Sequence, residues 1–297
     1  MKNIKECIDA SFATPMNTTG MGNVSDTSGD ALCLIPKDKK LKKKKMKPIK
    51  KYISEKLVLN KGTFKRPEIK SHPETSQDLK DLIVHKIRNN NNSETLDLND
   101  IDVSEITDMR FLFNVPKIRA TLHDYNIKKI DINYWNTKNV TNMSYMFFQC
   151  STIEEINISN INVESLDNAD CMFSDCKKLK RLDLSSWNTD KLRRSSMMFG
   201  TCTNLIDIGD LSNWKMKNIE DCSGMFENCL SLVKVGDILG KWKLPKAENI
   251  NRMFYLCESL TDIGNTQVLF DWKLNPDCQR SLVFYGCRSL KKKPVMK

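Results

Sequence analysis

One short motif recurs through most of the chain and restricts the folds that are open to it. The motif reads F-x-x-C-x-x-(L/I), and it occurs at Phe147/Cys150/Ile153, Phe173/Cys176/Leu179, Phe199/Cys202/Leu205, Phe226/Cys229/Leu232, Phe254/Cys257/Leu260 and Phe284/Cys287/Leu290. Successive phenylalanines lie 26, 26, 27, 28 and 30 residues apart. A period in this range is typical of a solenoid, in which each unit buries its apolar face only by stacking on its neighbours.

Each repeat has two halves with different patterns. After the cysteine, the pattern (L/I)-x-x-(L/I)-x-(L/I)-x-x-W, seen in 179–187, contains a period-2 segment that predicts one short strand. After the tryptophan, a turn rich in Asn, Ser and Thr leads to apolar residues spaced as in 140–147, and this spacing predicts a short helical or 3₁₀ turn. We therefore expect an α/β solenoid of about seven coils over 94–297, with one strand and one short helix per coil.

The regions before the repeats differ from them in composition. Residues 1–48 are rich in small polar residues and lysine, and we expect a disordered tail there. Residues 49–93 are expected to form a linker and a helical N-terminal cap, with a helix over 76–89 that begins after Ser76 as its N-cap. Residues 114–126 read as an insertion between the first two coils.

The positive charge of the chain is concentrated in one run. The formal net charge is +10, and residues 37–51 carry ten lysines and one aspartate, a net +9, which leaves +1 for the rest. This run is open to three interpretations: a solubilising linker, a tether to nucleic acid or an anionic surface, and a nuclear import signal. The candidate tether residues are Lys42, Lys43, Lys44 and Lys45. The sequence shows no transmembrane segment and no recognisable secretion signal, so the location of the protein stays open.

Cysteine and histidine usage argues against catalysis and metal binding. The chain has eleven cysteines, and we expect all of them to be reduced, with the six repeat cysteines in a buried column; disulfides between coils are the alternative. No cysteine pair has zinc-ligand spacing, and His72, His85 and His123 are scattered. We therefore predict no catalytic, cofactor-binding or metal site, and no enzymatic activity.

Two sets of residues are candidates for contact with a ligand. The tryptophan slot could serve packing between coils or form a stacking platform for sugars or bases. On the predicted strands, Asp131, Asn157 and Asp183 follow one another at intervals of 26 residues. This column is either a solvated sheet face or a surface that binds a protein partner or a cation.

The string W-N-T-x-x-V-T-N-M-S-x-M-F-x-x-C, present at 135–150, resembles the leucine-rich repeats of the BspA-like bacterial surface protein family, in the form catalogued as a mycoplasma repeat of unknown function. The resemblance covers 94–290 and implies a leucine-rich-repeat-like solenoid used for attachment to host proteins or other cells, without catalytic residues. The stretch MNTTGMGN, which begins at Met16, and the segment 98–109 are similar to BspA-like proteins encoded by gut bacteriophages.

Two functions from different classes follow. The first is a non-enzymatic protein-binding or adhesion module that recognises a protein of unknown identity through the concave face of the solenoid. The alternative is a structural or virion-associated spacer protein anchored by its basic N-terminal tail.

Overall fold

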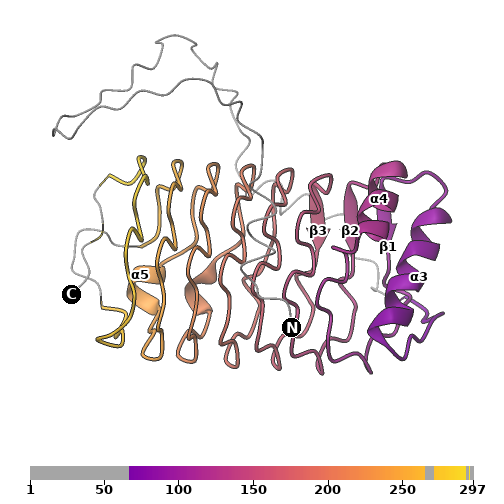
Figure 1. The fold of residues 1–297 in the computed structure, drawn as a ribbon, viewed down its shortest axis with the longest axis horizontal. Helices are drawn as coiled ribbons and strands as arrows, with labels where there is room; N and C mark the ends of the chain where they lie inside the picture. Colours follow the sequence, from indigo (N-terminus) through magenta and orange to yellow (C-terminus); the bar gives the residue numbers. More distant parts are fainter. Residues whose placement is uncertain (1–66, 265–270, 292–293, 295–297) are drawn as a thin grey trace, which may run out of the picture. The chain divides into compact units, whose positions relative to one another are not determined.

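The repeats form a stack of coils. The computed structural model describes residues 67–264, 271–291 and 294, all of which belong to one compact unit, Phe64–Lys297. Within this unit the coils lie side by side, with helix α3 at one end and residues 271–291 at the other (Figure 1). The predicted tail, its lysine run and the candidate tether residues Lys42–Lys45 lie outside the described residues.

A parallel ladder runs along one side of the stack. Strands β1 (Thr95–Asp97), β2 (Lys129–Asp131) and β3 (Glu155–Asn157) form a parallel sheet in the order β1-β2-β3. Single parallel bridges continue it through Arg181, Asp207, Lys234 and Asp262. We call this the first ladder. One rung for each repeat confirms the prediction of a solenoid.

A second ladder joins the coils at another side. Parallel bridges connect Asp108, Asn142, Asn168, Arg194, Asp221, Asn249 and Gln279 in that order. After each of these residues comes the apolar segment for which a short helix was predicted.

The prediction of a short helix in each coil is wrong. The segment is a run of tight turns in which Tyr145 and Gln149 have φ values of 58° and 60°. Positive φ recurs at the matching positions of the later coils: Cys171, Asp175, Met197, Thr201, Gly224, Asn228, Arg252, Leu256, Leu282 and Gly286. A right-handed helix cannot contain such residues. In such a run of turns, residues three and four apart lie on the same side, as they do in a helix. The apolar spacing alone therefore does not distinguish a run of turns from a helix.

The turns are bonded to the next coil, always in the same direction. The N–H groups of Met143, Tyr145, Phe147 and Gln149 donate to the carbonyls of Asn168, Asp170, Met172 and Ser174 at 2.8–2.9 Å. The pattern repeats in each later coil, up to the N–H groups of Ile250, Arg252, Phe254 and Leu256, which donate to Gln279, Ser281, Val283 and Tyr285 at 2.7–2.9 Å. Within these segments, the bonds between coils thus have their donors on the earlier coil and their acceptors on the later one.

These bonds link peptide groups head to tail. The carbonyl of Met172 and the N–H of Phe173 belong to one peptide group, which accepts from Phe147 and donates to Met198. The same relay occurs at all four positions of the segment. We call the resulting rows the four peptide columns. Their dipoles are aligned through the stack, as they are along an α-helix.

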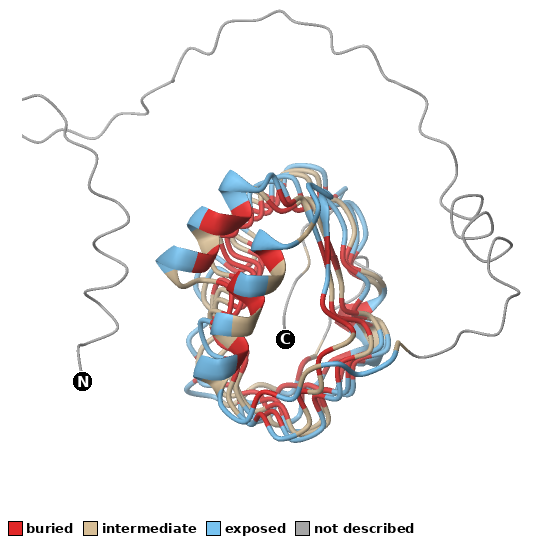
Figure 2. Cartoon of the chain, turned by 90° about the vertical axis from the view of Figure 1, so that its right-hand side faces the viewer, coloured by how far each residue is buried: buried red, intermediate tan, exposed pale blue. Residues whose placement is uncertain are grey.

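The core contains columns of like residues, and buried residues recur at matching places of successive coils in a view along the stack (Figure 2). Phenylalanine rings from Phe113 to Phe284 stack with centroids 4.7–5.5 Å apart. Beside them lie the repeat cysteines, whose thiols donate to the carbonyl of the preceding coil's phenylalanine, for example Cys202 Sγ to Phe173 O at 3.0 Å. The described cysteines are all free: Cys150, Cys171, Cys176, Cys202, Cys222, Cys229, Cys257, Cys278 and Cys287. The buried column expected for the six repeat cysteines is confirmed.

Helices occur at the N-terminal end and in two later turns. Helix α3 (Ser76–Arg88) buries Leu79, Ile83, Val84 and Ile87 and begins with a capping box in which Thr75, not Ser76, is the N-cap. The expected insertion contains helix α4 (Pro116–Asp124), which packs on α3. The short elements η1 (Leu211–Asn213) and α5 (Ile238–Lys241) lie in turns before tryptophans. Among the described residues, no helix combines the length and apolar character needed to span a membrane.

Candidate functional site

The first ladder carries a regular pattern of charge. Its outward-facing rungs alternate in sign through Lys129, Glu155, Arg181, Asp207, Lys234 and Asp262. Lys129 Nζ lies 3.1 Å from Glu155 Oε2. We call these residues, together with Asp131, Asn157 and Asp183, the first-ladder face. Alternating charges stabilise their neighbours and leave a surface with a specific pattern but little net charge.

Two of the three predicted site residues lie together on this face. The sheet register pairs Asp131 with Asn157. Asn157 Nδ2 donates to Asp131 Oδ2 at 2.8 Å, and Asn99 Nδ2 donates to Asp131 Oδ1 at 2.8 Å. Amide groups therefore satisfy the Asp131 carboxylate.

Asp183, one coil further along, caps its own turn. Its Oδ1 accepts the backbone N–H of Ser185 at 3.2 Å and the Ser185 hydroxyl at 2.6 Å. Asp183 is exposed, whereas Asp131 and Asn157 are half-buried. Of the three predicted residues, Asp183 is therefore the one most accessible to a partner.

Sequence reasoning missed a row of carboxylates that continues from Asp183. The Oδ1 atoms of Asp183, Asp210 and Asp237 lie over glycines of the next coil, where a Cβ added to Gly209, Gly236 or Gly264 would stand 2.7, 1.9 or 2.1 Å away. The glycines have φ values of 81°, 89° and 104°. They therefore provide both the backbone conformation and the space for these carboxylates. The sequence signal was a glycine two residues after each late rung of the first ladder. No cluster of three metal-ligating side chains occurs in the described part of the chain.

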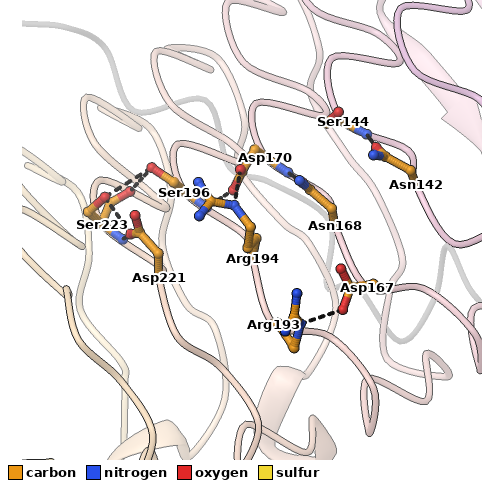
Figure 3. A network of polar contacts seen from close by, with 10 residues as sticks. All are labelled: Asn142, Ser144, Asp167, Asn168, Asp170, Arg193, Arg194, Ser196, Asp221 and Ser223. Carbon is orange, nitrogen blue, oxygen red and sulfur yellow. Dashed lines mark hydrogen bonds and ion pairs between the residues drawn. The ribbon is translucent and has the colours of Figure 1, made fainter. Parts of the chain in front are cut away.

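The second ladder carries an ion-pair network (Figure 3). Arg193 Nε lies 2.6 Å from Asp167 Oδ1, and Arg194 Nε lies 2.8 Å from Asp170 Oδ2. The other oxygen of Asp170 accepts the backbone N–H of Ser196 at 2.8 Å. Burial raises the pKa of Asp170, and the bond from Arg194 opposes this shift. Both carboxylates are thus paired between coils, which is a structural role.

A pocket of about 300 Å³ lies between α4 and the turn at 149–152. Arg119 Nη1 donates to Gln149 Oε1 there at 2.5 Å. Cys150 also lines the pocket, but burial raises the pKa of its thiol to about 12. A thiol with this pKa is not a nucleophile at neutral pH.

The tryptophans serve packing and not ligand stacking. Their side chains are only 0–3% exposed, so their ring faces are closed to a sugar or a base. Four indoles donate to a carbonyl of the preceding coil, for example Trp214 Nε1 to Leu184 O at 2.9 Å. The stacking-platform hypothesis is therefore wrong.

Stacked coils with recurring inward columns, such as those of phenylalanine and cysteine, and variable outward rungs define a repeat protein of the solenoid class. A profile of the family described as "Mycoplasma protein of unknown function, DUF285" matches residues 83–205, 117–236 and 183–296. The chain belongs to this family, the BspA-like family that its motif resembles.

Comparisons beyond the family are weaker. No curated protein matches the chain. A leucine-rich repeat protein of T. pallidum is 16% identical, with a TM-score of 0.43 over 67% of this chain and 78% of that one. A leucine-rich repeat protein of Bacteroides ovatus is also 16% identical, with a TM-score of 0.20 over 64% of this chain and 58% of that one.

Proposed function

We propose that the protein is a non-enzymatic binding or adhesion module of about seven coils, which recognises a protein partner through the first-ladder face, the face expected to be concave. Asp131, Asn157 and Asp183 belong to the proposed contact surface. The observation that carries the proposal is the alternation of charge along this face.

The contrast between the buried and the exposed positions of each coil supports this function. Most inward slots hold an apolar packing residue, and the repeat thiols and most indoles are engaged in bonds between coils. The outward rungs of the first ladder lie at the surface, where pairs such as Lys129 and Glu155 form, and they differ from coil to coil in charge and length. An ordered row of different charges selects a partner by complementarity, because a misplaced partner brings like charges together.

The test uses variants that change the face without changing the fold. Asp183→Asn removes the charge but keeps an oxygen that accepts the Ser185 N–H, and Arg181→Glu and Lys234→Glu reverse exposed rungs. Lys217→Glu, an exposed change in a turn off both ladders, is the control. The full chain is immobilised and its binders from an extract are identified by mass spectrometry. We then measure the affinity of the purified binder for each variant.

We expect the three face variants to bind the partner more weakly, while Lys217→Glu binds like the wild type. Equal binding by all four variants would place the contact elsewhere on the chain. Binding that disappears only when residues 1–51 are deleted would favour the alternative function, a spacer protein anchored by its N-terminal tail.

A further inference from the structure

Helix α4 is specific to one coil. It lies between Phe113 and Ile127, which are 14 residues apart, whereas the matching residues of each later repeat, such as Phe147 and Ile153, are only six residues apart. The pocket of about 300 Å³ lies between this helix and the turn at 149–152. Because α4 forms one of its walls, the pocket is a feature of this coil and does not follow from the packing of the repeat.

The walls of the pocket carry one permanent positive charge. Among the lining residues, which all belong to the described part of the chain, Arg119 is the only lysine or arginine, and none is Asp or Glu. Its side chain donates to a neutral acceptor, Gln149 Oε1, at 2.5 Å, and it forms no ion pair with a described residue. Its Nε is buried and has no acceptor there. A guanidinium has five N–H groups, so Arg119 retains most of its capacity to bind an anion.

The other walls provide neutral polar groups and apolar surface. The hydroxyls of Ser151 and Thr152 form no hydrogen bond with a described residue, so each can donate to a ligand or accept from it. Pro116, Ala120 and Leu122 supply apolar surface. A small number of polar groups in an otherwise apolar pocket is typical of a site for a small molecule.

The volume and the charge of the pocket restrict the ligand. At about 30 Å³ for each water-sized group, the pocket holds a molecule of roughly ten non-hydrogen atoms. The single charge of Arg119 matches the single charge of a carboxylate, whereas a phosphate group carries about two negative charges at neutral pH. The planar guanidinium also matches the two oxygens of a planar carboxylate.

We propose that the pocket between α4 and the turn at 149–152 binds a small organic carboxylate, whose anionic group is held by Arg119 and whose remaining atoms contact Ser151, Thr152 and the apolar wall. The lining residues do not belong to the first-ladder face, and the proposal does not depend on the proposed function.

The probes are two small carboxylates, each with a neutral counterpart of similar size. Benzoate is compared with benzamide, and glucuronate with glucose, so that an apolar and a hydroxylated body are both tested. Inorganic phosphate is the third anion. Binding is followed on the full wild-type chain by nuclear magnetic resonance, from the Nε–H signal of Arg119 and the backbone amides of Ser151 and Thr152. These signals report on the pocket itself and not on other basic residues of the chain.

Three variants test whether the pocket is responsible. Arg119→Gln removes the charge. Ala120→Leu fills the pocket from an exposed position of α4 and leaves the guanidinium in place, so it keeps the test decisive if Arg119→Gln does not fold. Arg110→Gln is the matched control, because Arg110 is exposed, pairs with Asp108 and does not line the pocket.

We expect at least one of the two carboxylates to shift all three wild-type signals with a Kd in the millimolar range or tighter, while its neutral counterpart leaves them unchanged. Arg119→Gln should weaken binding at least about tenfold, because hydrogen bonds between two charged groups are lost. Ala120→Leu should weaken it to a similar extent, and Arg110→Gln should bind like the wild type.

Four results would overturn the proposal. The first is that neither carboxylate shifts the three signals at concentrations of tens of millimolar. The second is equal binding of a carboxylate and its neutral counterpart, which would show an apolar pocket that does not recognise charge. The third is tighter binding of phosphate than of either carboxylate, which would assign the pocket to phosphate groups. The fourth is wild-type affinity in Ala120→Leu, which would place the bound carboxylate outside the pocket.

Discussion

Truncation of one ring in the phenylalanine column tests the packing of the coils. Phe199 is 0% exposed, and its ring lies between those of Phe173 and Phe226 at centroid distances of 5.5 and 5.2 Å. Phe199→Ala removes a buried ring, which costs about 3–5 kcal/mol when the cavity cannot collapse. Collapse is hindered here because hydrogen bonds between coils fix the spacing of the neighbouring rings.

The same substitution at the end of the column is the matched control. Phe284 is half-buried and stacks on Phe254 at 5.5 Å. Phe284→Ala should cost at least about 1 kcal/mol less than Phe199→Ala, because less apolar area returns to water and a weaker set of ring contacts is lost. Asn213→Ala, an exposed change in η1, should stay within about 0.5 kcal/mol of the wild type.

Urea unfolding followed by tryptophan fluorescence and by circular dichroism measures these free energies, and coincidence of the two signals checks that the stack unfolds as one unit. If Phe199→Ala unfolds at the wild-type urea midpoint, or if the two phenylalanine variants lose equal stability, the column is not the core of the stack.

Further predictions concern the thiols, the indoles and the tail. All eleven cysteines should titrate as free thiols in denaturant without reductant; a shortfall of two or more would reveal a disulfide. Burial raises the pKa of Cys202 from 9.0 to about 12, so the unfolded chain loses this proton first. Stability should therefore fall above pH 9 by about 1.4 kcal/mol per pH unit for each such thiol, and Cys202→Ala should make the decline in urea midpoint shallower. The buried Trp187 Nε1 has no acceptor in the described part of the chain, whereas Trp214 Nε1 donates to Leu184 O at 2.9 Å. Trp214→Phe should thus destabilise by about 1 kcal/mol more than Trp187→Phe, and equal urea midpoints would contradict this reasoning. Deletion of 1–51 should abolish any salt-sensitive binding to DNA in a filter assay; a truncated chain with full affinity would show a basic surface on the repeats.

The buried positions of each coil could be predicted from the sequence because the same packing residues recur in every repeat. Phenylalanine and cysteine recur in fixed slots, and the structure places them in columns. The interval of 26 residues between Asp131 and Asn157 likewise becomes the sheet register.

The turns were not readable for a physical reason. A glycine in the sequence usually indicates a position with left-handed φ. Here Tyr145, Gln149 and other residues with side chains adopt left-handed φ instead. The hydrogen bonds between coils hold these residues in a conformation that their own preferences disfavour. Local sequence does not encode such bonds, so the pattern predicted a helix.

The role of the exposed positions could be predicted only in part. Asp131 and Asp183 were candidates for binding, and the structure shows that both also satisfy local hydrogen bonds. A partner is selected by exposed side chains that packing does not constrain, so no repeat in the sequence reveals its identity.

The most direct test of the peptide columns is to identify the carbonyl that accepts the hydrogen bond of a single backbone N–H. Scalar couplings across hydrogen bonds, measured by nuclear magnetic resonance on the deuterated protein, identify the carbonyl that each N–H contacts. The peptide columns predict coupling from the Phe199 nitrogen to the carbonyl carbon of Met225, in the next coil, where the bond is 2.8 Å long. Coupling from Phe199 to the carbonyl carbon of Ser195, four residues earlier in the same coil, would show a helix in place of the peptide columns and contradict the account.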